Sequence, residues 1–327
     1  MNHTVACVAE ELFASDAPHG LSLALVLMHR GELVFERYGT RPDTAFGSGG
    51  PVDAGTTLIS WSMAKSITHA AVGILVGDDV LDPTMPAAVP SWRGTPKESI
   101  TLQQLLDMRS GLEWVEDYVD DSVSNCIEML FGSGQHDMAG YAAALPIAVA
   151  AGSTWNYSSG TTNMICRIVG DAVGGGREGM ETFLRERLFD PAGMHSAVPE
   201  FDTAGTFVGS SYVYATARDF ALFGELYRND GTVGGERLLP EGWCDHARAF
   251  VAHDEDDFDY GSHWWLWRDQ PGSLACHGYE GQYCVVVPER ELVMVHLGKS
   301  PVDNRVELTS RLRTIVNSVE RRTELSR

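Results

Sequence analysis

Two strand-rich hairpins stand near opposite ends of this chain, and they constrain the fold more than any other feature. The first covers residues 21–39, "LSLALVLMHRGELVFERYG", with two β-rich runs around "HRGE". The second covers residues 281–299, "GQYCVVVPERELVMVHLGK", with two apolar runs around "PERE". Because neighbouring hairpins favour antiparallel pairing, we expect both chain ends to share one antiparallel sheet.

Helical patterns flank these hairpins and fill the stretch between them. Each terminal pattern predicts a helix that covers the sheet. The apolar residues of the first helix are Val5, Val8 and Leu12, and those of the last helix are Val306, Leu308, Leu312, Ile315 and Val319. We therefore predict an α+β fold. Residues 1–60 plus 260–327 form the sheet region, residues 61–259 form a mainly helical region inserted between them, and one ligand site lies in the cleft between the two.

Composition excludes several classes of protein. The chain has 327 residues, 44% of them hydrophobic, which is enough for one large or two intimate domains. A net charge of −21 without a basic run argues against nucleic-acid binding and favours neutral or cationic ligands. The apolar runs fall short of the ~20 residues that span a bilayer. We expect no signal peptide, and six scattered cysteines without a CxxC pair indicate reduced thiols in a cytoplasmic protein.

One apolar helical stretch, "SWSMAKSITHAAVGILVG" at residues 60–77, carries Ser62, Lys65 and His69 on a single face. A serine hydroxyl is a weak nucleophile unless a neighbouring group takes its proton, and a lysine does so when burial or nearby cations lower its pKa. Ser62 at the helix start would also lie where backbone N–H groups favour a developing negative charge. The spacing SxxK thus predicts a reactive centre, although a helix-start serine and a surface lysine give the same spacing.

Two further segments could complete such a centre. Tyr157 and Ser159 precede an apolar helical stretch, where a tyrosine could share a proton with Lys65 and act as general acid, or could simply pack. In "CHGYEGQYC", Gly278 and Gly281 would let the backbone approach a ligand, so that the N–H groups of Ser62 and Tyr279 form an oxyanion hole. A plain bulge at the start of a strand explains these glycines equally well.

Taken together, these segments resemble the superfamily of serine β-lactamases and penicillin-binding proteins, and most of all its class C β-lactamase-like esterases and amidases. The matches are "SMAK" at 62–65, "YSS" at 157–159 in place of a Tyr-x-Asn element, and "HGYEGQ" at 277–282 in place of a Lys-Thr-Gly strand. Similar stretches extend along nearly the whole chain, at 105–114, 215–231 and 285–295. "RSGLEWVEDY" and "GYEGQY" look most like the 6-aminohexanoate-oligomer (nylon-oligomer) hydrolase branch, whose members act on short amides or carboxylic esters.

The resemblance implies a role for each matched residue. Ser62 would be the acylated nucleophile, Lys65 the base and Tyr157 the proton shuttle, with the N–H groups of Ser62 and Tyr279 as the oxyanion hole. It also implies that no cofactor and no metal are needed. We expect substrate contacts from Trp61, Tyr118, Ser159, Tyr214, His277 and Gly278.

Two departures from the family pattern narrow the expected chemistry. Ser159 replaces the asparagine that binds a substrate amide, and His277 replaces the lysine that holds a substrate carboxylate. A histidine is mostly neutral at pH 7, so β-lactamase activity should be weak or absent. Without a class A deacylating glutamate in view, deacylation is expected to reuse Tyr157 and Lys65.

Other polar and aromatic features receive structural interpretations. His69 is expected to be a core residue, and a Ser-His-Asp triad is disfavoured because no serine stands in a GxSxG elbow. The acidic strings 116–121 and 253–259 lack the loop spacing of a calcium site, so we expect solvated loops. "HWWLW" at 263–267 predicts a strand in which Trp264 or Trp265 faces the acyl pocket. Trp114 and Tyr283 are further candidates.

The sequence therefore predicts a serine hydrolase that cleaves an ester or small linear amide through an acyl-enzyme on Ser62. An acyltransferase of the same fold is the main alternative, followed by a D-amino-acid peptidase or amidase, a weak β-lactamase, and a non-catalytic binding or sensor domain. The expected partner is a small molecule, neither nucleic acid nor membrane, and the oligomeric state is left open between a monomer and a homodimer.

Overall fold

An eight-stranded antiparallel sheet dominates the computed structural model, which describes residues 3–43, 48–118, 123–254 and 257–321. The strand order is β10-β11-β12-β13-β14-β15-β1-β2, and β1 pairs directly with β15. The prediction that both chain ends share one antiparallel sheet is confirmed. The strands are β10 (Ala252–His253), β11 (Phe258–Tyr260), β12 (Trp265–Trp267), β13 (Leu274–Gly278), β14 (Gln282–Val287), β15 (Leu292–Lys299), β1 (Leu21–His29) and β2 (Glu32–Tyr38).

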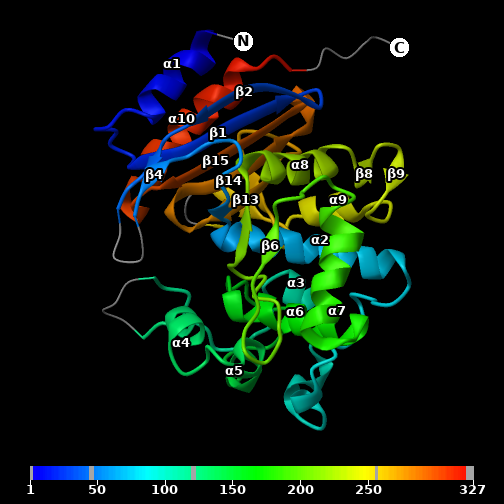
Figure 1. Ribbon diagram of the computed structural model, residues 1–327. Coiled ribbons are helices and arrows are strands. Elements are labelled where there is room, and N and C mark those ends of the chain that lie inside the picture. The colour runs from blue at the N-terminus through cyan, green and yellow to red at the C-terminus, as the bar shows by residue number, and fades with distance from the viewer. Residues whose placement is uncertain (1–2, 44–47, 119–122, 255–256, 322–327) are drawn as a thin grey trace.

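Side chains alternate between the two faces of this sheet, as strand geometry requires. Along β1, Ala24, Val26 and Met28 join the core on the inner face, while Leu25 and Leu27 join the core on the outer face. Helices α1 (His3–Leu12) and α10 (Arg305–Ser318) lie together over the outer face (Figure 1). The buried residues of these two helices are Val5, Val8, Ala9, Leu12, Leu308, Leu312, Ile315 and Val316.

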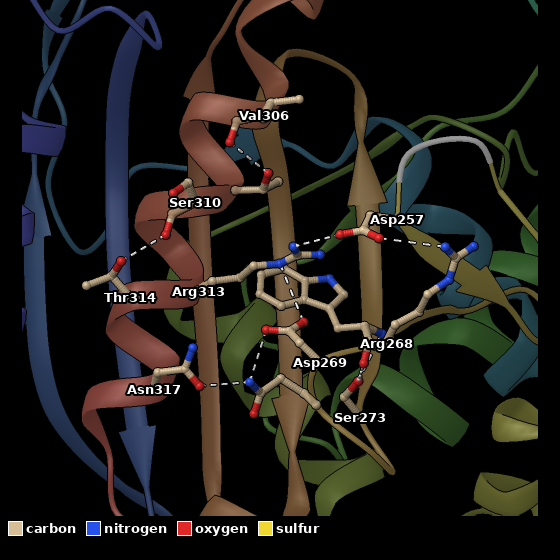
Figure 2. A network of polar contacts seen from close by, with 12 residues as sticks. Asp257, Arg268, Asp269, Ser273, Val306, Ser310, Arg313, Thr314 and Asn317 are labelled. Atoms are coloured by element: carbon tan, nitrogen blue, oxygen red, sulfur yellow. Dashed lines mark hydrogen bonds and ion pairs between the residues drawn. The ribbon is translucent and has the colours of Figure 1, made fainter.

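The predicted buried stripe on the last helix is wrong at one residue. Val306 is 74% exposed, because the first turn of α10 extends past the part of the helix that packs against the sheet, and Val316 is buried instead. Polar contacts hold the middle of α10 (Figure 2): Arg313 lies between Asp257, at 3.3 Å, and Asp269, at 3.5 Å, with its guanidinium 5.5 Å from the Trp267 ring. Asp257 and Asp259 of the acidic string 253–259 thus pair with arginines, whereas residues 255–256 lie outside the described ranges.

The inner face of the sheet is covered by α8 (Ala217–Arg228), which packs against β14, β15 and β1. Below α8 lies α2 (Ala64–Gly77), and the other helices of the middle region extend away from the sheet (Figure 1). The sheet also begins at Ala252 rather than at residue 260. The middle segment therefore supplies one helix, the edge strand β10 and the first two residues of β11 to the sheet layer.

The remaining helices and strands lie outside the main sheet. The helices are α3 (Leu102–Leu106), α4 (Asn125–Phe131), α5 (Met138–Ala144), α6 (Ser159–Val173), α7 (Gly176–Leu184) and α9 (Trp243–Arg248). A small sheet joins β5 (Leu58–Ile59), β7 (Val213–Ala215) and β6 (Val198–Pro199), and two-stranded ribbons pair β3 (Thr40–Arg41) with β4 (Gly50–Pro51) and β8 (Thr232–Val233) with β9 (Glu236–Arg237). Within the described ranges, no helix is both long and apolar enough to cross a membrane.

Candidate active site

Ser62 lies in a strained turn between a strand and a buried helix. It is the middle residue of the 3₁₀ turn η1 (Trp61–Met63), directly after β5 and before α2. Trp61 has a φ of +44°, a left-handed conformation that a bulky residue adopts only when its surroundings hold it there. Its ring lies 5.9 Å from Tyr212 and 5.8 Å from Tyr279. These contacts fix the turn that presents Ser62.

Lys65 is buried beneath Ser62 and is fully hydrogen-bonded. The residue is 2% exposed. Its Nζ donates to Ser62 Oγ, to Ser159 Oγ and to the carbonyl oxygen of Ser210, each at 2.9 Å. An ammonium group has three N–H donors, so each donor has an acceptor. The structure therefore brings the SxxK pair and the first residue of α6 into direct contact.

Tyr157 stands beside this lysine, with Lys65 Nζ 4.9 Å from its ring centre. Its ring is held among aromatic neighbours, 5.5 Å from Trp265 and 5.8 Å from Tyr260. Burial raises the pKa of Tyr157, and the positive charge of Lys65 opposes this rise. The phenol therefore keeps its proton at neutral pH and can donate it.

Glu116 is a site residue that the sequence analysis missed. Its string 116–121 was predicted to be a solvated loop, which is wrong for Glu116; residues 119–122 lie outside the described ranges. The carboxylate accepts hydrogen bonds from Trp114 Nε1 at 2.6 Å, Tyr118 OH at 2.7 Å, Ser159 N at 2.8 Å and Ser159 Oγ at 2.5 Å. The alternation of Trp114, Glu116 and Tyr118 is the signal that could have placed all three on one side of an extended segment.

The end of β13 lies directly against the turn that carries Ser62. A Cβ atom added to Gly278 would stand 2.4 Å from the carbonyl oxygen of Ser60, so only glycine allows this approach. Gly281 has a φ of +84°, and a Cβ there would lie 2.7 Å from Leu308. The close approach at Gly278 brings the backbone of Tyr279 alongside Ser62.

Two cavities meet at Ser62. The larger measures about 450 Å³ and is lined by Glu116, Tyr118, Tyr157, Trp265, His277, Gly278 and Tyr279 among others. The smaller, about 190 Å³, is lined by Trp61, Tyr118, Ser159 and Tyr279 together with Cys126, Ile127, Leu130 and Phe131. Tyr214 lines neither cavity in the described part of the chain, since β7 turns its side chain elsewhere, where it is 36% exposed. Every other predicted substrate contact lines one of the two.

His69 and the tryptophans of 263–267 have different surroundings. His69 is fully buried one turn beyond Lys65, where its ring nitrogens bond Tyr227 OH at 2.8 Å and His246 Nδ1 at 3.1 Å. Burial lowers the pKa of His69 well below its ordinary value. The predicted strand is shorter than expected and begins at Trp265, which lines the larger cavity, while Trp264 is buried in the core.

Metal ligands do not cluster here. In the described ranges no group of three or more His, Cys, Asp or Glu side chains could hold a metal ion. Cys126, at the smaller cavity, is a buried free thiol.

Comparison with known proteins gives this arrangement a family. The family described as Beta-lactamase matches residues 13–314, nearly the whole chain. The chain belongs to the beta-lactamase family.

The proteins similar to this beta-lactamase family member are named for different activities. The 6-aminohexanoate-dimer hydrolase of Paenarthrobacter ureafaciens is 26% identical over 261 residues, which cover 73% of this chain and 65% of that protein. A family VIII carboxylesterase has a TM-score of 0.69 at 15% identity, and the match covers 95% of this chain and 98% of the esterase chain. Simvastatin synthase from Aspergillus terreus has a TM-score of 0.73 at 14% identity, and the match covers 97% of this chain and 98% of the synthase chain. The two solved structures share the fold of this chain.

The next-to-last residue of β13, His277, packs among aromatic side chains. His277 Nε2 accepts a hydrogen bond from Trp267 Nε1 at 3.0 Å, and its ring stacks on Trp265 at 5.1 Å. Burial, reinforced by the positive charge of Arg305, lowers the pKa of His277 well below its ordinary value. His277 is therefore neutral, and Arg305 Nη2 lies 3.5 Å from His277 Nδ1.

Proposed function

We propose that this protein is a serine hydrolase that cleaves a carboxylic ester or a small linear amide through a covalent acyl-enzyme on Ser62. The observation that carries the proposal is the 2.9 Å contact between Lys65 Nζ and Ser62 Oγ, made by a lysine that is nearly inaccessible to solvent. A buried amine in contact with a hydroxyl is the arrangement that activates a weak nucleophile.

In the acylation step, Ser62 Oγ attacks the carbonyl carbon of the substrate while its proton passes to Lys65. The main-chain N–H groups of Ser62 and Tyr279 stabilise the oxyanion. Collapse of the tetrahedral intermediate breaks the bond to the leaving group, which takes a proton from the Tyr157 phenol. Lys65 then returns a proton to Tyr157. The step therefore leaves acyl-Ser62 and a protonated leaving group, with no net change in the protonation of Lys65 and Tyr157.

Deacylation reverses these roles. A water molecule replaces the leaving group, loses its proton through Tyr157 and Lys65, and attacks the acyl carbon. Ser62 Oγ leaves with a proton, and the carboxylic acid is released. No cofactor takes part in either step.

The proposed substrate class follows the lining of the site. The larger cavity is lined by several aromatic rings and by charges of both signs, Glu116, Glu280 and Arg305, and Glu280 is paired with Lys299 at 2.8 Å, which favours uncharged groups. A neutral His277 provides no charge for a substrate carboxylate. The relative from Paenarthrobacter ureafaciens is named for a linear amide dimer, which supports small linear amides as candidates beside esters.

An acyltransferase would use the same acyl-enzyme with a hydroxyl or amine in place of water. The 450 Å³ of the larger cavity gives space for such an acceptor beside Ser62. Addition of alcohols or amines to an ester assay separates the two: a hydrolase releases the free acid, and a transferase diverts most of the acyl group to the acceptor.

The proposal is tested by turnover of a short-chain p-nitrophenyl ester and a linear amide with wild-type protein, S62A and a control, S91A, at an exposed serine. We expect turnover by the wild type and S91A and none above background by S62A. Full turnover by S62A would contradict the proposal.

A further inference from the structure

The carboxylate of Glu116 is saturated by protein donors. Oε1 accepts from Tyr118 OH and Ser159 Oγ, and Oε2 accepts from Trp114 Nε1 and Ser159 N. A carboxylate has about four lone-pair sites, two on each oxygen. Glu116 therefore has no site left for a substrate group or an attacking water, although it lies at the wall of the catalytic cavity. Its chemistry must act through the residues that it holds.

The most informative of these partners is Ser159, whose hydroxyl has a single hydrogen. A carboxylate accepts and cannot donate, so Ser159 Oγ must spend its hydrogen on Glu116 Oε1. Toward Lys65 the same oxygen can then act only as an acceptor, and Lys65 Nζ lies 2.9 Å away. Glu116 thereby fixes the direction of the hydrogen bond between Lys65 and Ser159.

The carbonyl oxygen of Ser210 fixes a second direction, because a carbonyl also accepts only. Two of the three tetrahedral positions on Lys65 Nζ must therefore carry hydrogens whether the amine is charged or neutral. The third position faces Ser62 Oγ at 2.9 Å. When Lys65 is neutral, its lone pair can lie only at this third position, directed at the hydroxyl whose proton it must take.

We propose that Glu116 is a positioning residue that acts through Ser159 to aim the lone pair of Lys65 at Ser62. The inference rests on the proposed function, because it assumes that Lys65 is the base in acylation. Without the carboxylate, Ser159 can rotate and donate its hydrogen to Lys65, which directs the lone pair away from Ser62.

This arrangement also accounts for the departure from the Tyr-x-Asn pattern at 157–159. An asparagine carbonyl oxygen can only accept, so it needs no second group to fix its polarity toward a lysine. A serine hydroxyl can donate or accept, and it behaves as a pure acceptor only when another group takes its hydrogen. In this chain the Ser159 and Glu116 pair supplies that one-way acceptor.

The test is a double-mutant cycle on the rate constant of acylation, measured from the pre-steady-state burst with a p-nitrophenyl ester. E116Q is isosteric, and its amide oxygen still accepts hydrogen bonds, but its NH₂ group can donate to Ser159 and release the serine hydrogen. We expect E116Q to lower the acylation rate constant roughly 100-fold, with a smaller change in KM, as a misdirected base does. S159A should lose a similar factor, and E116Q/S159A should be no slower than S159A alone.

The control is E113Q, the same change at an exposed glutamate of the same segment, which should acylate at the wild-type rate. Equal losses from E116Q in the wild-type and S159A backgrounds would overturn the proposal, because a purely structural role through Trp114 or Tyr118 does not depend on Ser159. A rate for E116Q within about threefold of wild type would also overturn it. If E116Q melts early, S159A decides alone, and an undiminished rate for S159A refutes the inference. The wild-type and S62A assays decide the proposed function independently of these outcomes.

Discussion

The backbone of Gly278 lies so close to Ser60 that a Cβ atom on residue 278 would stand 2.4 Å from the Ser60 carbonyl oxygen. This approach joins the end of β13 to the turn that carries Ser62, two segments more than two hundred residues apart in the chain. Because both contacting groups are backbone, neither can yield as a flexible side chain would. The two segments that form the proposed oxyanion hole can therefore approach this closely only because residue 278 has no Cβ atom.

We predict that G278A separates these segments. The clash should cost about 1–3 kcal/mol of the free energy of unfolding and lower kcat/KM by roughly 100-fold, since small misplacements of reacting groups are expensive. G170A is the matched control, because a Cβ at Gly170 in α6 meets nothing within 4 Å. It should keep activity and gain up to about 1 kcal/mol from helix propensity. Thermal melts and ester turnover check both variants, and a fully active G278A would contradict the account.

Lys65 gives the second prediction. K65A removes the proposed base and should lower kcat/KM by roughly 10³-fold, within the range for general base catalysis, while far-UV circular dichroism stays native. Turnover by K65A close to that of the wild type would argue against Lys65 as the base.

Tyr157 gives a prediction that depends on the leaving group. The burial that raises the pKa of Tyr157 keeps its proton in place, ready to be given to a departing amine or alkoxide. p-Nitrophenolate leaves without that proton. Y157F should therefore lose roughly 100-fold in acylation by an amide or alkyl ester and much less with a p-nitrophenyl ester. Equal losses on both substrate types would show that the phenol does not act as the acid.

His69 is predicted to affect stability and not the reaction. Burial lowers its pKa well below the ordinary value of about 6.5, so the native state leaves it neutral while the unfolded state binds a proton as the pH falls. That difference destabilises the native protein below about pH 6.5 by about 1.4 kcal/mol per pH unit. H69Q should flatten the pH dependence of the unfolding free energy by that amount between pH 6 and 5 and leave the pH profile of ester turnover unchanged. A displaced kinetic profile would assign His69 to the reaction.

His277 limits the reaction with β-lactams. Because His277 is neutral and bonded to Trp267, we expect slow turnover of a chromogenic cephalosporin, with kcat/KM roughly 100-fold or more below that for a short ester, as expected when about 3 kcal/mol of binding to the transition state is missing. Comparable values for the two substrates would show that another group, such as Arg305, binds the carboxylate.

Local patterns in the sequence predicted the sheet and the first pair of site residues. Each hairpin is contiguous in the chain, so its alternation and turn are visible within about twenty residues, and Ser62 and Lys65 are separated by less than one helical turn. Tyr157 and Tyr279 required the family resemblance, because nothing in their own segments fixes where they lie relative to Ser62.

The residues that the sequence did not predict correctly share a physical cause. The surroundings of each depend on segments that are distant in the chain. Glu116 belongs to an acidic string that looks solvated, and its role exists only because the start of α6 brings Ser159 to it across 43 residues. Tyr214 depends on how the short strand β7 pairs with β5 and β6. Val306 has the helical period of a buried residue, but burial depends on where the helix leaves the sheet.

The acyl-enzyme on Ser62 is tested most directly by the mass of the protein during turnover of a slowly hydrolysed ester, followed by peptide mapping of the quenched sample. We expect a mass increase equal to one acyl group, located on Ser62 within residues 60–77 and absent from S62A. An acyl group on another residue, or turnover without any covalent intermediate on Ser62, would contradict it.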